Sequence, residues 1–178
     1  MKKAKIFVSL SVLCLSIAAL CMGILASQSV TYSIQGTITY TAPILYNGDG
    51  TSDNNLSKYI ATQLSSNVSD IVSVSFTTTK PTETDLTTKV NVGWESSSNS
   101  IIDSYVAYCT MSSNMKYYVV IYSSLSDIIM PKNSAYMFSG CSNLTSINIQ
   151  SADFSGVEDI SGLFNGCSGL TEIGRAHV

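Results

Sequence analysis

The chain has 178 residues, which suggests one or two small domains. Apolar residues make up 45% of it and charged residues only 12%, so Ser, Thr and Asn supply most of the polar surface. Between Ser27 and Thr171, five lysines and eleven acidic residues leave a balance of −6, with no arginine. Because nucleic-acid-binding proteins need a basic surface, this composition argues against a nucleic-acid partner.

The N-terminal segment predicts export. Lys2, Lys3 and Lys5 precede 21 uncharged residues at 6–26. Crossing a ~30 Å hydrocarbon layer takes about 20 apolar residues, and a basic start followed by an apolar stretch is also typical of a secretory signal. We expect residues 1–27 to be a cleaved signal peptide or a membrane anchor spanning 6–26. In either case the remainder of the chain is exported.

The next region has the patterns of a β domain with one helix. Residues 29–41 alternate between apolar and polar side chains, which predicts a long strand with one buried face. Residues 55–64 place apolar side chains at helical spacing after two candidate N-cap residues, Asn54 and Asn55. Further strands are predicted at 71–76, 89–94, 104–110 and 116–123. We therefore expect 28–130 to form a small, mainly antiparallel, β-sandwich-like domain.

A repeat follows. Residues 137–147, MFSGCSNLTSI, and 163–173, LFNGCSGLTEI, align without a gap at an offset of 26, with seven of eleven positions identical. A period of 26 lies in the leucine-rich-repeat range. Leu144, Ile147 and Ile149 have the spacing of an inward-facing short strand. Because one coil cannot bury its own apolar side chains, it is stable only when it stacks on a neighbouring coil.

The stretch MFSGCSNLTSINIQSADFSGVEDISGLFNGCSGLTEI resembles the leucine-rich repeats of BspA-type bacterial surface proteins, including a mycoplasma-type variant of unknown function. The resemblance covers about 131–171 and lacks the usual Thr-Ser before Val157 and the usual Met at positions 160 and 163. It implies the start of a leucine-rich-repeat solenoid, in an adhesion or host-interaction protein that usually carries many repeats. Repeat proteins bind with the exposed residues of their strands. The candidate partner-binding residues are Thr145, Ser146, Asn148 and Gln150.

The last seven residues, EIGRAHV, have a separate explanation. The nucleotide string GAGATCGGAAGAGCACACGTC encodes them and contains the start of a common sequencing-library adapter. We therefore interpret 172–178 as an adapter-derived tail rather than a genuine short tail. We expect the repeat pattern to stop after Thr171, with an incomplete array, although Glu172 and Ile173 are ambiguous, because Ile173 matches Ile147 and is also encoded by the adapter. This tail holds the only arginine, Arg175, and the only histidine, His177.

Without the tail, catalysis has few candidate residues. A Ser-His or Cys-His dyad and a His-ligated catalytic zinc both need histidine. The chain contains no G-x-S-x-G, P-loop or G-x-G-x-x-G motif. The loop at 47–58 resembles a calcium loop only in part, because Ser52 and Lys58 stand where glycine and a chelating glutamate are needed. We interpret it as a turn, and we expect no catalytic residue, no cofactor and no metal.

Two functions remain. The first is a non-enzymatic exported surface protein that binds an unknown protein or host-surface ligand through its repeats. The alternative is a structural subunit of a surface fibre or matrix, assembled by strand addition at the edge of the β domain. Cys141 and Cys167 lie one coil apart, where a disulfide is geometrically allowed; we favour two buried thiols.

Overall fold

The structure is a computed structural model that describes residues 42–95, 99–124 and 127–174. The expected leader at 1–27 and the expected strand at 29–41 lie outside these residues, as do Arg175 and His177. Over the part of the chain that is described, none of the helices has both the length and the apolar character needed to cross a membrane.

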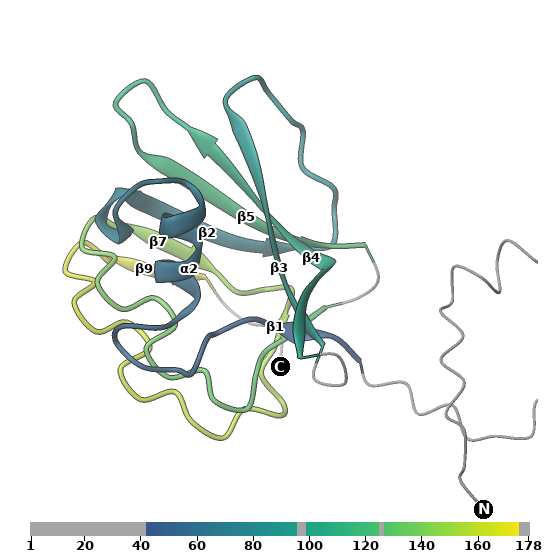
Figure 1. The fold of residues 1–178 in the computed structure, drawn as a ribbon. Helices are drawn as coiled ribbons and strands as arrows, with labels where there is room; N and C mark the ends of the chain where they lie inside the picture. Colours follow the sequence, from purple (N-terminus) through teal and green to yellow (C-terminus); the bar gives the residue numbers. More distant parts are fainter. Residues whose placement is uncertain (1–41, 96–98, 125–126, 175–178) are drawn as a thin grey trace, which may run out of the picture. The chain divides into compact units, whose positions relative to one another are not determined.

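One seven-stranded sheet dominates the described residues, in the strand order β1-β3-β4-β5-β2-β7-β9 (Figure 1). Its strands are β1 (Ile44–Leu45), β2 (Ile71–Thr77), β3 (Thr87–Glu95), β4 (Ser100–Met111), β5 (Tyr117–Ser123), β7 (Ser146–Asn148) and β9 (Glu172–Gly174). A two-stranded parallel sheet joins β6 (Ile128–Ile129) to β8 (Ala152–Asp153). The helices are α2 (Leu56–Gln63) and the 3-10 turn η1 (Val68–Asp70).

The sheet is mixed. Strands β1, β3, β4 and β5 pair antiparallel, whereas β5, β2, β7 and β9 pair parallel. The prediction of a mainly β fold with one α-helix is confirmed. The expected antiparallel sandwich is not found among the described residues, where the strands share their core with α2 and with the segment 137–144. Alternation of apolar and polar residues predicts that one face of a strand is buried. It does not predict the direction of the neighbouring strand or the segment that covers the buried face.

Helix α2 forms where its spacing predicts it. Asn55 is the N-cap, and its Oδ1 accepts a hydrogen bond from the backbone N–H of Lys58 at 3.1 Å. Leu56, Ile60 and Ala61 are buried on the side facing the core. The chain then turns at Ser65, whose φ is +52°. This prediction is confirmed, with Asn55 rather than Asn54 as the cap.

The seven-stranded sheet and the hydrophobic core both extend past residue 130, the predicted end of the β domain. Val74 of β2 pairs with Ile147 of β7, and both side chains are buried. The rings of Phe76 and Phe138 lie 6.4 Å apart at 81° in the same core. Residues 131–174 therefore share one sheet and one hydrophobic core with the segments that precede them.

The two repeats have the same backbone conformation. We call 133–148 the first repeat and 159–174 the second repeat. Tyr136 and Gly162, 26 residues apart, both have positive φ, at +52° and +62°. Gly140 and Gly166 match in the same way, at +81° and +75°. The green and yellow paths of these segments run side by side in Figure 1.

The repeat pattern continues past Thr171. Ser146, Ile147 and Asn148 of β7 pair in parallel with the residues 26 positions later, which form β9. The expectation that periodicity stops after Thr171 is therefore wrong for residues 172–174. Strand β9 forms because the backbone of β7 offers a free edge, and Ile173 repeats the inward position of Ile147.

Candidate functional site

The four residues predicted to bind a partner lie on or beside β7. Thr145, Asn148 and Gln150 are exposed and Ser146 is half-buried, whereas Ile147 between them is buried in the core. The period-two alternation of a strand thus places Ser146, Asn148 and Gln150 together on the outer face of the sheet, whereas Thr145 directly precedes β7.

Thr145 differs from the other three residues in its hydrogen bonds. Thr145 donates to the carbonyl of Val72 from both its N–H, at 2.9 Å, and its Oγ1, at 3.1 Å. Its own carbonyl accepts from Thr171, so Thr145 links β2 to the second repeat. Gln150 N–H donates to Asn148 Oδ1 at 3.0 Å, which orients the amide of Asn148 on the surface.

Neighbouring strands add polar residues to the same face. Ser146 pairs with Ser73 of β2 on one side and with Glu172 of β9 on the other. Asn148 pairs with Ser75 in the same way. A shallow depression joins them, and we call its polar residues the strand-face site: Ser73, Ser75, Ser146, Asn148, Gln150 and Glu172. Hydroxyl, amide and carboxylate groups at this spacing suit hydrogen bonding to a polar ligand.

The sequence did not identify Ser73 and Ser75 as part of this site. Alternation in 71–77 indicated that they face outward, but their position beside Ser146 depends on the parallel pairing of β2 with β7. Those two strands are more than 60 residues apart in the chain, so only the tertiary structure joins them.

Tyrosines extend the outer face across β5 and β4, and they too were missed. Tyr118 is 51% exposed, and Tyr122 packs edge-on against Tyr108 with ring centroids 6.0 Å apart. Lys89 Nζ lies 5.9 Å from the centroid of the Tyr108 ring and 3.0 Å from Glu83 Oε2. The signal was present in the sequence, because Tyr118 and Tyr122 alternate with the buried residues of β5.

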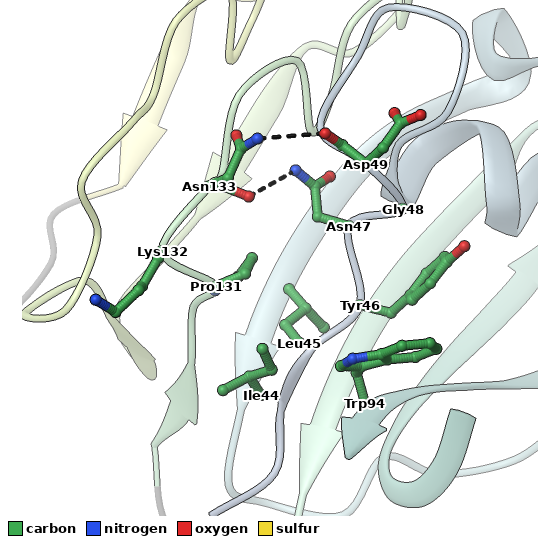
Figure 2. A pocket seen from close by; sticks show the side chains of 10 residues that line it. All are labelled: Ile44, Leu45, Tyr46, Asn47, Gly48, Asp49, Trp94, Pro131, Lys132 and Asn133. Carbon is green, nitrogen blue, oxygen red and sulfur yellow. Dashed lines mark hydrogen bonds between the residues drawn. The ribbon is translucent and has the colours of Figure 1, made fainter. Parts of the chain in front are cut away.

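A second hollow lies around Trp94, at the other end of the described fold (Figure 2). The ring centroids of Trp94 and Tyr46 lie 5.4 Å apart, and those of Tyr46 and Tyr59 lie 4.9 Å apart. Trp94 is only half-buried and packs at the margin of the core, where its outer side faces the hollow.

On the polar side of this hollow, hydrogen bonds of Asn47 link segments that are far apart in the chain. Figure 2 shows the amide of Asn47 pointing at the backbone of Asn133, to which Nδ2 donates at 3.1 Å. The same nitrogen donates to the carbonyl of Ala135 at 3.0 Å, and Oδ1 accepts from the N–H of Leu56. Asn47 is 4% exposed. Its bonds with Ala135 and Leu56 are buried, and its bond with Asn133 is partly buried. Residues 48–55 form turns and bends, as predicted for this loop, whereas 56–58 already belong to α2. Asn47 joins the loop to the first repeat by these hydrogen bonds.

Searches of known protein families, curated proteins and solved structures found no match to this chain. In 42–95, 99–124 and 127–174, no group of three or more His, Cys, Asp or Glu side chains is arranged to hold a metal ion. The candidate binding groups are therefore the exposed side chains themselves. They are the hydroxyls, amides and one carboxylate of the strand-face site, and the aromatic rings of Trp94 and of the β5 tyrosines.

The two repeat cysteines differ in exposure. Cys141 is fully buried, and burial raises the pKa of its thiol to about 12. Cys167 is half-buried, its Sγ lies 3.0 Å from the carbonyl oxygen of Phe138, and burial also raises its pKa. Both are free thiols in this structure. A raised pKa keeps a thiol protonated near neutral pH and lowers its reactivity.

Proposed function

We propose that this is an exported bacterial surface protein without catalytic activity, in which residues 131–171 begin a BspA-type leucine-rich-repeat array that binds a protein or host-surface ligand. The observation that carries the proposal is the strand-face site, where short polar side chains of three parallel strands lie side by side over a buried core. The matching turns of the two repeats support the assignment of the array.

Export is tested first. The lysines at positions 2, 3 and 5 and the uncharged residues 6–26 support it. Cells expressing the full gene are fractionated, and intact cells are treated with a protease. We expect the product in the membrane, at the surface or in the medium, and cleavage of any cell-bound product by the external protease. A product confined to the cytoplasm contradicts the proposal.

Binding through the strand face is tested with cultured epithelial cells as the probe. Fluorescently labelled protein is titrated onto the cells, and Asn148→Lys is compared with the wild type. A long charged side chain in the middle of the strand-face site is expected to weaken saturable binding at least tenfold. Asn91→Lys is the matched control, because Asn91 is also an exposed asparagine on a strand. Equal binding by all three proteins contradicts this site.

The alternative, a fibre subunit built by strand addition, has less support. The outer strands of the described seven-stranded sheet, β1 and β9, are two and three residues long. Short edge strands offer few free backbone groups to an incoming strand. Size-exclusion chromatography of the whole chain tests this alternative. A shortened domain ending near residue 130 is unsuitable, because it would lose β7 and expose the edge of β2.

A further inference from the structure

The depression of the strand-face site continues beyond the repeats. It has a volume of about 420 Å³ and shares Ser75, Asn148 and Gln150 with a second depression of about 500 Å³. The second depression lies beside β2 and β5 and reaches the residues that follow β2, where Thr77 and Thr79 line it. We call the two depressions together the polar trough. Because it lies mainly on neighbouring strands, its polar groups are held in fixed positions, and its elongated form suits an extended ligand.

The fold does not use the serine hydroxyls of the polar trough. Among the described residues, the Oγ atoms of Ser73, Ser75 and Ser146 have no hydrogen-bond partner, and all three side chains are half-buried. Gln150 N–H donates to Asn148 Oδ1, which leaves the Nε2 of Gln150 without an acceptor in the described protein. These hydroxyl and amide groups are therefore available to hydrogen-bond a ligand in place of water.

The polar trough carries almost no charge. Of its described lining residues only two are charged, Glu172 in the first depression and Lys80 in the second. Lys80 Nζ lies 4.0 Å from Glu83 Oε1, so its charge is already partly balanced. A polyanion such as a nucleic acid needs several lysines or arginines along its binding surface. The trough therefore fits an uncharged ligand with many hydrogen-bonding groups.

An exposed aromatic ring stands beside these hydroxyls. Tyr118 of β5 pairs with Ser73 of β2, which pairs with Ser146 of β7, so the three side chains form a row across three strands. Neighbouring strands lie about 4.8 Å apart, so the row spans roughly 10 Å. The Tyr118 side chain is 51% exposed. A sugar ring has a face of C–H groups, which an aromatic ring can cover, and a rim of hydroxyls, which serine and amide groups can hydrogen-bond.

A protein partner fits the trough less well than a sugar. The centres of protein–protein interfaces are apolar and are depleted in serine. The polar trough has serines at its centre, and three of its apolar lining residues are at most 4% exposed: Val74, Phe76 and Ile147. Little apolar surface is thus left there for a protein to bury.

We propose that the polar trough binds an oligosaccharide of uncharged sugars. Tyr118 covers the C–H face of one sugar ring, and the free hydroxyl and amide groups of the trough bind the hydroxyls of the adjoining sugars. The inference rests on the proposed function, since it names a glycan as the ligand of the strand-face site. It adds β5 and residues 77–79 to that site, and these lie outside the repeats.

The first test identifies the class of ligand. The purified whole chain is applied to an array of immobilised oligosaccharides that includes neutral, sialylated and sulfated members. We expect saturable binding to neutral members and competition by the best of them in free form. Binding to no member of the array, or to the charged members alone, overturns the proposal.

The second test asks whether binding uses the trough. One variant combines Ser73→Ala with Ser75→Ala, and another is Tyr118→Ala. We expect each to weaken binding of the best neutral oligosaccharide at least tenfold. The serine variant should keep the wild-type midpoint of urea denaturation, because its hydroxyls have no partner in the described fold. Leu86→Ala is the control for Tyr118→Ala, since Leu86 is 52% exposed and does not line the trough. Wild-type affinity in either variant, or an equal loss in the control, overturns the proposal.

A third test separates this inference from the proposed function. Labelled protein is bound to epithelial cells before and after mild periodate oxidation, which cleaves the vicinal diols of sugars. We expect the oxidation to reduce binding at least tenfold. Undiminished binding that Asn148→Lys still weakens would indicate a protein ligand at the strand-face site, and would overturn the glycan while leaving the proposed function in place. Binding to the array but to no cell would instead support the glycan and contradict the proposed host-surface ligand.

Discussion

Gly162 lies against the ring of Tyr136, the residue that occupies the same place one repeat earlier. A β-carbon on Gly162 would come 2.5 Å from Cε1 of that ring, and the φ of Gly162 is +62°. The stacking of the two repeats therefore depends on the absence of a side chain at this position.

Gly162→Ala should lower the free energy of unfolding by about 1–3 kcal/mol, because alanine is strained at positive φ and its methyl group would displace the Tyr136 ring. Urea denaturation at neutral pH measures this change. Gly156→Ala is the control: nothing lies within 4 Å of its β-carbon position, and we expect it to unfold as the wild type does. An unchanged midpoint for Gly162→Ala would show that the ring is not held against this turn.

Leu144 and Leu170 occupy equivalent positions in the two repeats but differ in burial. Leu144 is fully buried and Leu170 is half-buried. We expect Leu144→Ala to lower the free energy of unfolding by about 2–5 kcal/mol, the usual cost of a cavity in a packed core. Leu170→Ala should cost less than half as much, because water already reaches its surroundings. Equal losses in urea denaturation would contradict an open second repeat.

Asn47→Ala should destabilise the fold by about 3 kcal/mol. The substitution removes the partner of the buried N–H of Leu56, of the buried carbonyl of Ala135 and of the partly buried carbonyl of Asn133. Asn91→Ala serves as the control, because Asn91 is exposed. Amide exchange at Leu56 should accelerate in the first variant only. A variant as stable as the wild type would mean that Asn47 does not cap the first repeat.

The ion pair between Lys116 and Asp70 should make stability depend on acidic pH. Lys116 Nζ lies 2.7 Å from Asp70 Oδ1, and hydrogen bonds from Lys116 and Ser66 lower the pKa of the Asp70 carboxyl well below its ordinary value of 3.8. Since the folded-state pKa is the lower one, the stabilisation is complete above about pH 4 and is lost as the pH falls toward the folded-state pKa.

Asp70→Asn should therefore reduce the free energy of unfolding by about 1 kcal/mol at pH 7, and the difference from the wild type should shrink at pH 2.5. Urea denaturation at both pH values gives the comparison. Glu158→Gln removes an exposed ion pair with Lys132, and we expect no measurable change at either pH. A difference for Asp70→Asn that is the same at pH 7 and pH 2.5 would rule out ionisation as its cause.

The three cysteines of the described residues, Cys109, Cys141 and Cys167, should react with iodoacetamide in the order of their burial. Burial raises the thiol pKa of Cys109 and Cys141 to about 12, and both side chains are fully buried. Cys167, only half-buried, should be alkylated at least tenfold faster in the native protein at pH 8, as followed by peptide mass spectrometry. In urea the three rates should converge. Native-state alkylation of Cys141 as fast as that of Cys167 would contradict the stacked arrangement.

Local patterns in the sequence predicted the local structure. Helical spacing after Asn55 predicted α2, and alternation predicted the four long strands near their observed bounds. The 26-residue identity between the repeats predicted two segments of like conformation, because like residues, above all the two pairs of matching turns, favour like backbone angles. These features depend on neighbours within a few positions in the chain.

Such local patterns could not predict how strands that lie far apart in the chain pair with one another. A strand with one apolar face reads the same whether its neighbour is parallel or antiparallel, so the sequence could not place β2 between β5 and β7 or bring Ser73 beside Ser146. Nor could it show that Asn47 and Ser57 take the carbonyls of the first repeat, since each is a polar residue of ordinary loop and helix character. The sequence by itself determined which segments are strands, helix and repeat. Only the tertiary structure decided which residues bind the carbonyls of the first repeat, because that depends on hydrogen bonds between residues more than 80 positions apart.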